Sequence, residues 1–183
     1  SFLTRPPVAN ATCVLVAVAV EQPAFDPDQV SRFLLTAEQT GLQVLLVLTK
    51  CDLLEPEELD QLKRRLQGWG YEPLLVSTQS GMGLEALRVQ LASAPISVLC
   101  GPSGVGKSSL LNGLLPGLTL RVGAVSGRLQ RGRHTTRHVE LHAIAPGARV
   151  ADTPGFNRPE LPDDVRNLEV LFPELRAQLC LLY

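Results

Sequence analysis

The sequence has few aromatic residues and almost no net charge. Phe, Trp and Tyr make up 4% of the 183 residues, and the formal net charge is −1. Overall charge therefore indicates no particular partner, and a charged binding surface would have to come from a local cluster. With 45% hydrophobic and 19% charged residues, the composition is typical of one globular domain and not of a disordered chain.

Long apolar segments and paired cysteines are also absent. The longest apolar run, Cys13–Val20, is too short to cross a bilayer, and no signal peptide is recognisable. The cysteines form no CxxC pair, which argues against a disulfide framework and a complete zinc site. We therefore expect buried free thiols in a reducing compartment: the cytoplasm, or an organelle stroma or matrix if a targeting segment has been removed. The cysteines are Cys13, Cys51, Cys100 and Cys180.

Short apolar runs alternate with helical patterns along most of the chain. Strands are expected at residues 14–20, 44–48, 74–76, 97–100, 137–144 and 149–151. Helices are expected at residues 28–40, from 56 to 68 or 70, at 84–91, from the end of GPSGVGKS to about 114, and in the tail from 163 with a break at Pro173. Residues 115–136 are expected to be mostly loop. Because such alternation implies right-handed crossovers, the sequence predicts one α/β domain with three layers, a mostly parallel sheet covered by helices on both faces.

Residues 101–108, GPSGVGKS, fit the phosphate-loop pattern G-x-x-x-x-G-K-[ST] between an apolar strand and a helical run. Such a loop points backbone N–H groups at a phosphate, and the following helix adds its positive dipole end. Lys107 is expected to bridge the β- and γ-phosphates, and the Ser108 hydroxyl to bind Mg²⁺. The predicted nucleotide-binding residues are Gly101, Pro102, Ser103, Gly104, Val105, Gly106, Lys107, Ser108 and Ser109.

Residues 49–52, TKCD, follow a predicted strand and resemble the [NT]KxD motif with which GTPases read the base. Guanine offers two donors, N1–H and the 2-amino group, to the Asp52 carboxylate, and adenine lacks that arrangement. The aliphatic stem of Lys50 can lie over the base, Thr49 can tie this loop to the phosphate loop, and Cys51 completes the predicted set. Taken alone, such a Lys–Asp pair at a strand end is usually a solvated turn.

Residues 77–83, STQSGMG, follow the next predicted strand. They resemble the Ser-Ala loop whose backbone contacts the guanine oxygen, with Ser77 matching and Thr78 in place of the usual alanine. This third element favours the base-reading interpretation of TKCD over the solvated turn.

Residues 152–155 read DTPG directly after a predicted strand, in the form of the Asp-x-x-Gly motif that senses the γ-phosphate. Asp152 would hold Mg²⁺, usually through water, and the Gly155 N–H would reach the γ-phosphate. In isolation DTPG could be an ordinary Pro-Gly turn. In sequence with the other motifs the switch interpretation is favoured.

The order of the motifs is a cyclic shift of the usual GTPase order, because the base reader precedes the phosphate loop. Circular permutation explains this, since the folded topology fixes the site and chain termini can move between exposed loops. With GPSGVGKSSLLN, GRHTT and ADTPGF, the sequence resembles the RsgA (YjeQ) type of circularly permuted ribosome-biogenesis GTPase, from about Asn10 to Pro173.

The resemblance implies an enzyme that binds GTP or GDP with Mg²⁺, hydrolyses GTP and acts on the small ribosomal subunit during its late maturation. Membrane contact is not expected, and the chain is expected to be a monomer. Members of that family usually carry an N-terminal OB-fold domain and a C-terminal zinc-binding domain. We expect residues 1–183 to be the permuted GTPase domain without either, with Cys180 a candidate first residue of the zinc segment.

GRHTT, residues 132–136, would be the switch segment whose threonine closes on the bound metal ion. Thr135 or Thr136 would close on the metal, and the Thr-Arg pair found there in related GTPases favours Thr136. The glutamine that orients the attacking water in Ras-like enzymes is replaced here by Phe156. The resemblance suggests His134 as its substitute, because a neutral imidazole can accept a hydrogen bond from water; the alternative is that His134 only orders the loop or contacts RNA.

Five arginines and two histidines lie between residues 121 and 139, with no acidic or aromatic residue among them. This segment is expected to contact rRNA phosphates without stacking on bases. Alternatively, its arginines neutralise the negative charge of the nucleotide. Two other functions stay open for the whole chain. A small-molecule kinase would explain GPSGVGKS but leave the other motifs as coincidences, and a nucleotide-binding assembly module with little hydrolysis would be consistent with Phe156.

Overall fold

The computed structural model describes residues 10–115, 117–118, 120, 140–152 and 172–173. Its strands are β1 (Cys13–Ala19), β2 (Gln43–Thr49), β3 (Leu74–Leu75), β4 (Ile96–Cys100), β5 (Glu140–Ala145) and β6 (Ala148–Asp152). Its helices are α1 (Pro27–Glu38), α2 (Pro56–Gly68), α3 (Leu84–Ala92) and α4 (Lys107–Leu114), with a short 3-10 turn, η1, at Cys51–Leu53. Within these ranges, no helix is both long and apolar enough to cross a membrane.

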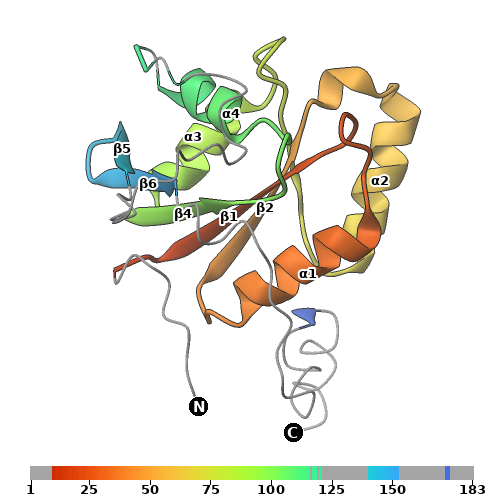
Figure 1. Ribbon diagram of the computed structural model, residues 1–183, viewed down its shortest axis with the longest axis horizontal. Coiled ribbons are helices and arrows are strands. Elements are labelled where there is room, and N and C mark those ends of the chain that lie inside the picture. Colours follow the sequence, from red (N-terminus) through yellow and green to blue (C-terminus); the bar gives the residue numbers. More distant parts are fainter. Residues whose placement is uncertain (1–9, 116, 119, 121–139, 153–171, 174–183) are drawn as a thin grey trace, which may run out of the picture.

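The six strands form one sheet in the order β3-β2-β1-β4-β6-β5. All neighbouring strands are parallel except β5 and β6, which form an antiparallel pair around the turn at 146–147. One apolar cluster joins the sheet to α1 and α2, and a second joins its other face to α3 and α4, as Figure 1 shows. The predicted three-layer α/β fold is therefore confirmed.

Local sequence signals explain where the helices begin. The Asp26 carboxylate accepts hydrogen bonds from the N–H groups of Asp28 and Gln29 at 3.0 and 3.2 Å, which caps α1. Helix α2 begins with Pro56 after a capping box between Glu55 and Glu58. Proline at the first helical position needs no hydrogen-bond acceptor and already has a helical φ, so both starts follow from sequence.

The predicted elements agree with the structure to within a few residues. Each of the 13–19 positions of β1 is buried, as expected for a continuous apolar strand covered on both faces. The strand predicted from residue 137 is described from Glu140 onward. Most of the predicted loop at 115–136 lies outside the described residues, as does the tail from 163 except for Phe172 and Pro173.

Three of the four cysteines are buried free thiols, as expected. Burial raises the pKa of Cys13 and of Cys51 to about 11, and that of Cys100 to about 12. Because the thiolate is the reactive form, these side chains pack as small apolar groups and are poor nucleophiles. Cys180 lies outside the described residues.

Candidate nucleotide site

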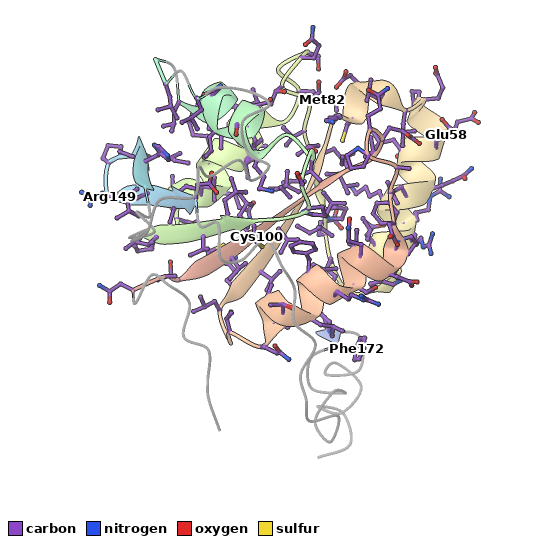
Figure 2. The ribbon with its side chains drawn as sticks, in the orientation of Figure 1. Glu58, Met82, Cys100, Arg149 and Phe172 are labelled. Atoms are coloured by element: carbon purple, nitrogen blue, oxygen red, sulfur yellow. The ribbon has the colours of Figure 1, made fainter. Side chains whose placement is uncertain are left out.

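The predicted nucleotide-binding loops lie at one edge of the sheet. Each of the strands β1, β2, β3 and β4 is followed by a loop, and because these strands are parallel their carboxyl ends meet at the same edge. Figure 2 shows Cys100 at the end of β4, directly before the phosphate loop. The topology therefore brings TKCD, STQSGMG and GPSGVGKS together, although long stretches of chain separate them.

The phosphate loop needs its glycines for stereochemical reasons. Gly101 has a φ of +146°, and a Cβ on it would lie 2.1 Å from the carbonyl oxygen of Ala17 on the neighbouring strand. Gly106, with a φ of +93°, is the residue that caps α4. A side chain at either position would be strained, so the loop can turn this tightly from β4 into α4 only with glycine.

Lys107 is the first residue of α4 and folds back over the loop. Its side-chain ammonium donates hydrogen bonds to the carbonyl oxygens of Gly101 and Pro102 at 2.7 and 2.8 Å, and the residue is only 4% exposed. Burial lowers the pKa of Lys107, while the nearby charges of Asp152 and Cys100 act in the opposite direction. The ammonium is thus held inside the turn of the loop, where a bound phosphate would meet it.

Thr49 connects the base-reading loop to the phosphate loop. Its hydroxyl donates to the Val105 carbonyl at 2.6 Å and also lies 3.2 Å from the Val18 carbonyl at the end of β1. Thr49 itself is buried. The tie that the sequence suggested between TKCD and GPSGVGKS is therefore present as a direct hydrogen bond.

Lys50 makes a second connection, which includes a loop that sequence reasoning missed. Its ammonium donates to the Gly104 carbonyl at 2.9 Å and to the Gln22 carbonyl in the loop after β1. Pro23 lies against the same part of the phosphate loop, since a Cβ on Gly104 would be 3.6 Å from its ring. Residues 20–24 follow a parallel strand that ends at the same edge of the sheet as the strand before TKCD. This position in the sequence could have predicted that they belong to the site.

Asp52, the predicted base reader, is exposed in η1. In the described part of the chain its carboxylate forms no hydrogen bond or ion pair. The adjacent Cys51 is buried, and its backbone N–H donates to the Val76 carbonyl at 3.2 Å, which fixes this turn to the end of β3. A rigid turn thus presents the carboxylate to solvent at the edge of the sheet.

The third loop, residues 77–83, is closed on itself by hydrogen bonds. Ser77 is fully buried, its hydroxyl accepts from the Ser80 N–H at 3.1 Å, and its own N–H donates to the Met82 carbonyl at 3.0 Å. Thr78 is exposed and lies near α4, where a Cβ on Gly113 would be 3.5 Å from its methyl group. The loop is therefore preformed beside the helix that follows the phosphate loop.

The described part of the predicted magnesium site is Ser108 and Asp152. Asp152 ends β6 and is paired with Leu99 of β4, so it lies beside the strand that leads into the phosphate loop. A hydroxyl and a carboxylate are oxygen donors of the kind that Mg²⁺ takes alongside nucleotide phosphates and water, so the residues suit this ion. Within the described ranges no group of three His, Cys, Asp or Glu side chains could hold a metal by itself.

Several predicted site residues lie outside the described part of the chain. These are His134, Thr135, Thr136 and Gly155. Pro102, Ser103, Val105 and Ser109 lie in or directly after the phosphate loop as expected.

A sheet of this order, with a glycine-rich turn and a buried lysine between β4 and α4, defines a P-loop NTPase fold with permuted motif order. The family model described as RsgA GTPase matches residues 1–162. The chain therefore belongs to the RsgA GTPase family.

Individual relatives agree with this assignment. The small ribosomal subunit biogenesis GTPase RsgA of Synechococcus sp. (strain CC9311) is 76% identical over 179 residues, which cover 98% of this chain and 59% of that protein. The crystal structure of YjeQ from Thermotoga maritima is 35% identical with a TM-score of 0.75, over 93% of this chain and 58% of that one. The structure of YloQ, described as a circularly permuted GTPase, is 30% identical with a TM-score of 0.67, over 94% of this chain and 54% of that one. The chain thus spans little more than half the length of these relatives.

Proposed function

We propose that this chain binds and hydrolyses GTP and acts as a switch in the late maturation of the small ribosomal subunit. The observation that carries the proposal is the pair of bonds from TKCD to the phosphate loop, Thr49 to Val105 and Lys50 to Gly104. A chance Lys–Asp turn would have no reason to be bonded to a phosphate loop. The family name and the names of the relatives support the same function.

The roles follow from position. Backbone N–H groups of residues 101–109 and the N-terminus of α4 would hold the phosphates, with Lys107 between the β- and γ-phosphates. Asp52 would accept from guanine, Lys50 would cover the base, and the Ser77–Thr78 backbone would contact the guanine oxygen. Cys51 can contribute only through its backbone, since its thiol is buried.

Magnesium would be bound by Ser108 and Asp152, completed by Thr136 from the switch, or by Thr135 in its place. When bound, the ion would supply positive charge that offsets the charge of the phosphates. Gly155 would contact the γ-phosphate through its N–H. His134 is proposed to orient the attacking water, because Phe156 has no group that can do so.

Equilibrium binding of a fluorescent GDP, competed with GTP, GDP and ATP, tests the site. We expect the wild type to prefer guanine nucleotides and Asp52→Asn to lose that preference, because an amide cannot accept from both guanine donors. Asp60→Asn removes an exposed carboxylate of α2 that pairs with Arg64, and is the matched control. Wild-type binding without base preference would contradict the role of TKCD.

The second candidate function is that of a nucleotide-binding assembly module with little hydrolysis, which Phe156 favours. Single-turnover hydrolysis with and without small ribosomal subunits separates the two. We expect a slow basal rate that the subunit accelerates, because Lys107 is the cation that the described residues hold inside the phosphate loop and a further positive charge would stabilise the transition state. Absence of turnover in both conditions would favour the assembly module.

The basic segment between residues 121 and 139 is proposed to contact rRNA phosphates, at the place where small subunits are assembled in the cytoplasm or an organelle. The chain is proposed to act there as a monomer. Affinity for rRNA that did not fall with salt would contradict phosphate contact, because neutralising phosphates releases counterions.

A further inference from the structure

The described residues form a pocket that is separate from the nucleotide loops. Its volume is about 210 Å³, and α1 supplies one wall with Ser31, Leu34 and Leu35. The Ser31 hydroxyl donates to the Pro27 carbonyl within the helix at 2.8 Å, so this wall offers mainly apolar surface. The pocket therefore suits an apolar occupant and not a charged ligand.

The opposite wall consists of two aromatic side chains that follow α2, Trp69 and Tyr71. The Arg65 guanidinium lies 5.7 Å from the centroid of the Trp69 ring, and the Tyr71 hydroxyl donates to the Glu38 carboxylate at the end of α1 at 2.9 Å. Arg65 and Glu38, which hold the two rings, do not themselves line the pocket. The wall is thus preformed, which reduces the entropy lost when a side chain docks against it.

The third side is Phe172 and Pro173, which are far away in sequence. Figure 2 shows Phe172 beside α1. The preceding described element, β6, ends at Asp152 next to β4, whereas α1 packs on β1 and β2. Asp152 and Phe172 therefore lie against different elements of the fold, Asp152 beside β4 and Phe172 beside α1.

We propose that the apolar surface formed by α1, Trp69 and Tyr71 is an anchor for the C-terminal part of the chain, with Phe172, which closes the third side of the pocket, as the anchoring side chain. An aromatic residue followed by proline suits that use, because Phe buries a large area with two rotatable bonds and the proline φ is already fixed. Docking would hold residues 172 and 173 against α1 and the end of α2. The inference needs no nucleotide and does not depend on the proposed GTPase activity.

Trp69 is the only tryptophan of the chain, so its fluorescence reports on this pocket. Acrylamide quenching of the 183-residue chain would be compared for wild type and Phe172→Ala. We expect the quenching constant to rise about twofold in the variant, because Phe172, which lines the same pocket as the indole, is lost and the pocket opens to solvent. Val89→Ala, which trims an exposed apolar residue of α3, is the control and is expected to quench like the wild type.

Two further variants keep the test decisive if Phe172→Ala does not fold. Phe172→Leu keeps an apolar anchor and is expected to retain most of the shielding, whereas Leu35→Asn alters the α1 wall and is expected to reproduce the loss. Far-UV circular dichroism would establish that each variant is folded. Unchanged quenching in folded Phe172→Ala or Leu35→Asn, or an equal rise in Val89→Ala, would overturn the anchor. Quenching that depends on protein concentration would assign the pocket to a second copy instead.

Discussion

The Thr49 hydroxyl donates a 2.6 Å hydrogen bond to the Val105 carbonyl, and this bond joins the loop after β2 to the phosphate loop before α4. Both residues are buried, so the Val105 carbonyl is shielded from water that could replace the hydroxyl. A nucleotide site built from two loops that are 56 residues apart in sequence needs such a connection, because the chain between them does not hold the loops together.

Thr49→Val should therefore weaken the fold at this point. The substitution keeps the shape of the side chain but leaves a buried carbonyl without its donor, which costs about 1–3 kcal/mol. We expect the free energy of unfolding in urea to fall by that amount and GDP affinity to fall with it. Thr36→Val is the matched control, because it removes a hydroxyl that donates to the Arg32 carbonyl at 2.8 Å within α1. Equal effects of the two variants would contradict the linking role of Thr49.

Gly101→Ala should strongly destabilise the fold. The new methyl group would lie 2.1 Å from the Ala17 carbonyl oxygen, which belongs to the central strand and has no room to move. We expect a loss of stability of about 3 kcal/mol or more in urea unfolding. Gly68→Ala at the end of α2 has open space and an ordinary φ, so that variant should be neutral or gain about 0.5–1 kcal/mol. A folded, stable Gly101→Ala chain would show that β4 does not pass β1 this closely.

The elements and most of the site could be predicted because their signals are local. Asp26 with Pro27 fixes one helix start, and the apolar run at 13–19 has the pattern of a strand buried on both faces. The Thr49 link was predictable because parallel strands place their following loops at one edge.

Contacts between distant segments left no such signal. The Gln22 carbonyl accepts from Lys50 through its backbone, which any residue type would provide. Phe172 lies beside α1 although the two are far apart in sequence, and no periodicity in the tail indicates this neighbour. The Lys107 side chain likewise folds back onto its own loop because the assembled core buries it. The local sequence does not indicate that burial.

Lys107 should make stability depend on pH in the alkaline range. Burial lowers its pKa below the ordinary 10.5, so between the folded and unfolded pKa values the unfolded chain binds more protons. Stability should therefore rise with pH in that window, and at lower pH the buried charge is a cost that the wild type carries. We expect the unfolding free energy of the wild type relative to Lys107→Met to increase from about pH 7 to about pH 10 in urea titrations without nucleotide. Lys63→Met on α2 is the reference, and a relative stability that fell with rising pH would contradict the assignment.

His134→Ala should separate catalysis from binding. If the imidazole orients the attacking water, its loss should lower single-turnover GTP hydrolysis by about 100-fold, the size of a typical general-base contribution. Affinity for GTP and GDP should stay nearly unchanged, because the phosphate loop and Asp52 lie on other segments. His138→Ala, a second histidine of the same basic segment, is the matched control and should retain most of the hydrolysis rate. Loss of affinity equal to the loss of turnover would assign His134 to ordering the loop, and equal rate losses in both variants would point to the charge of the segment.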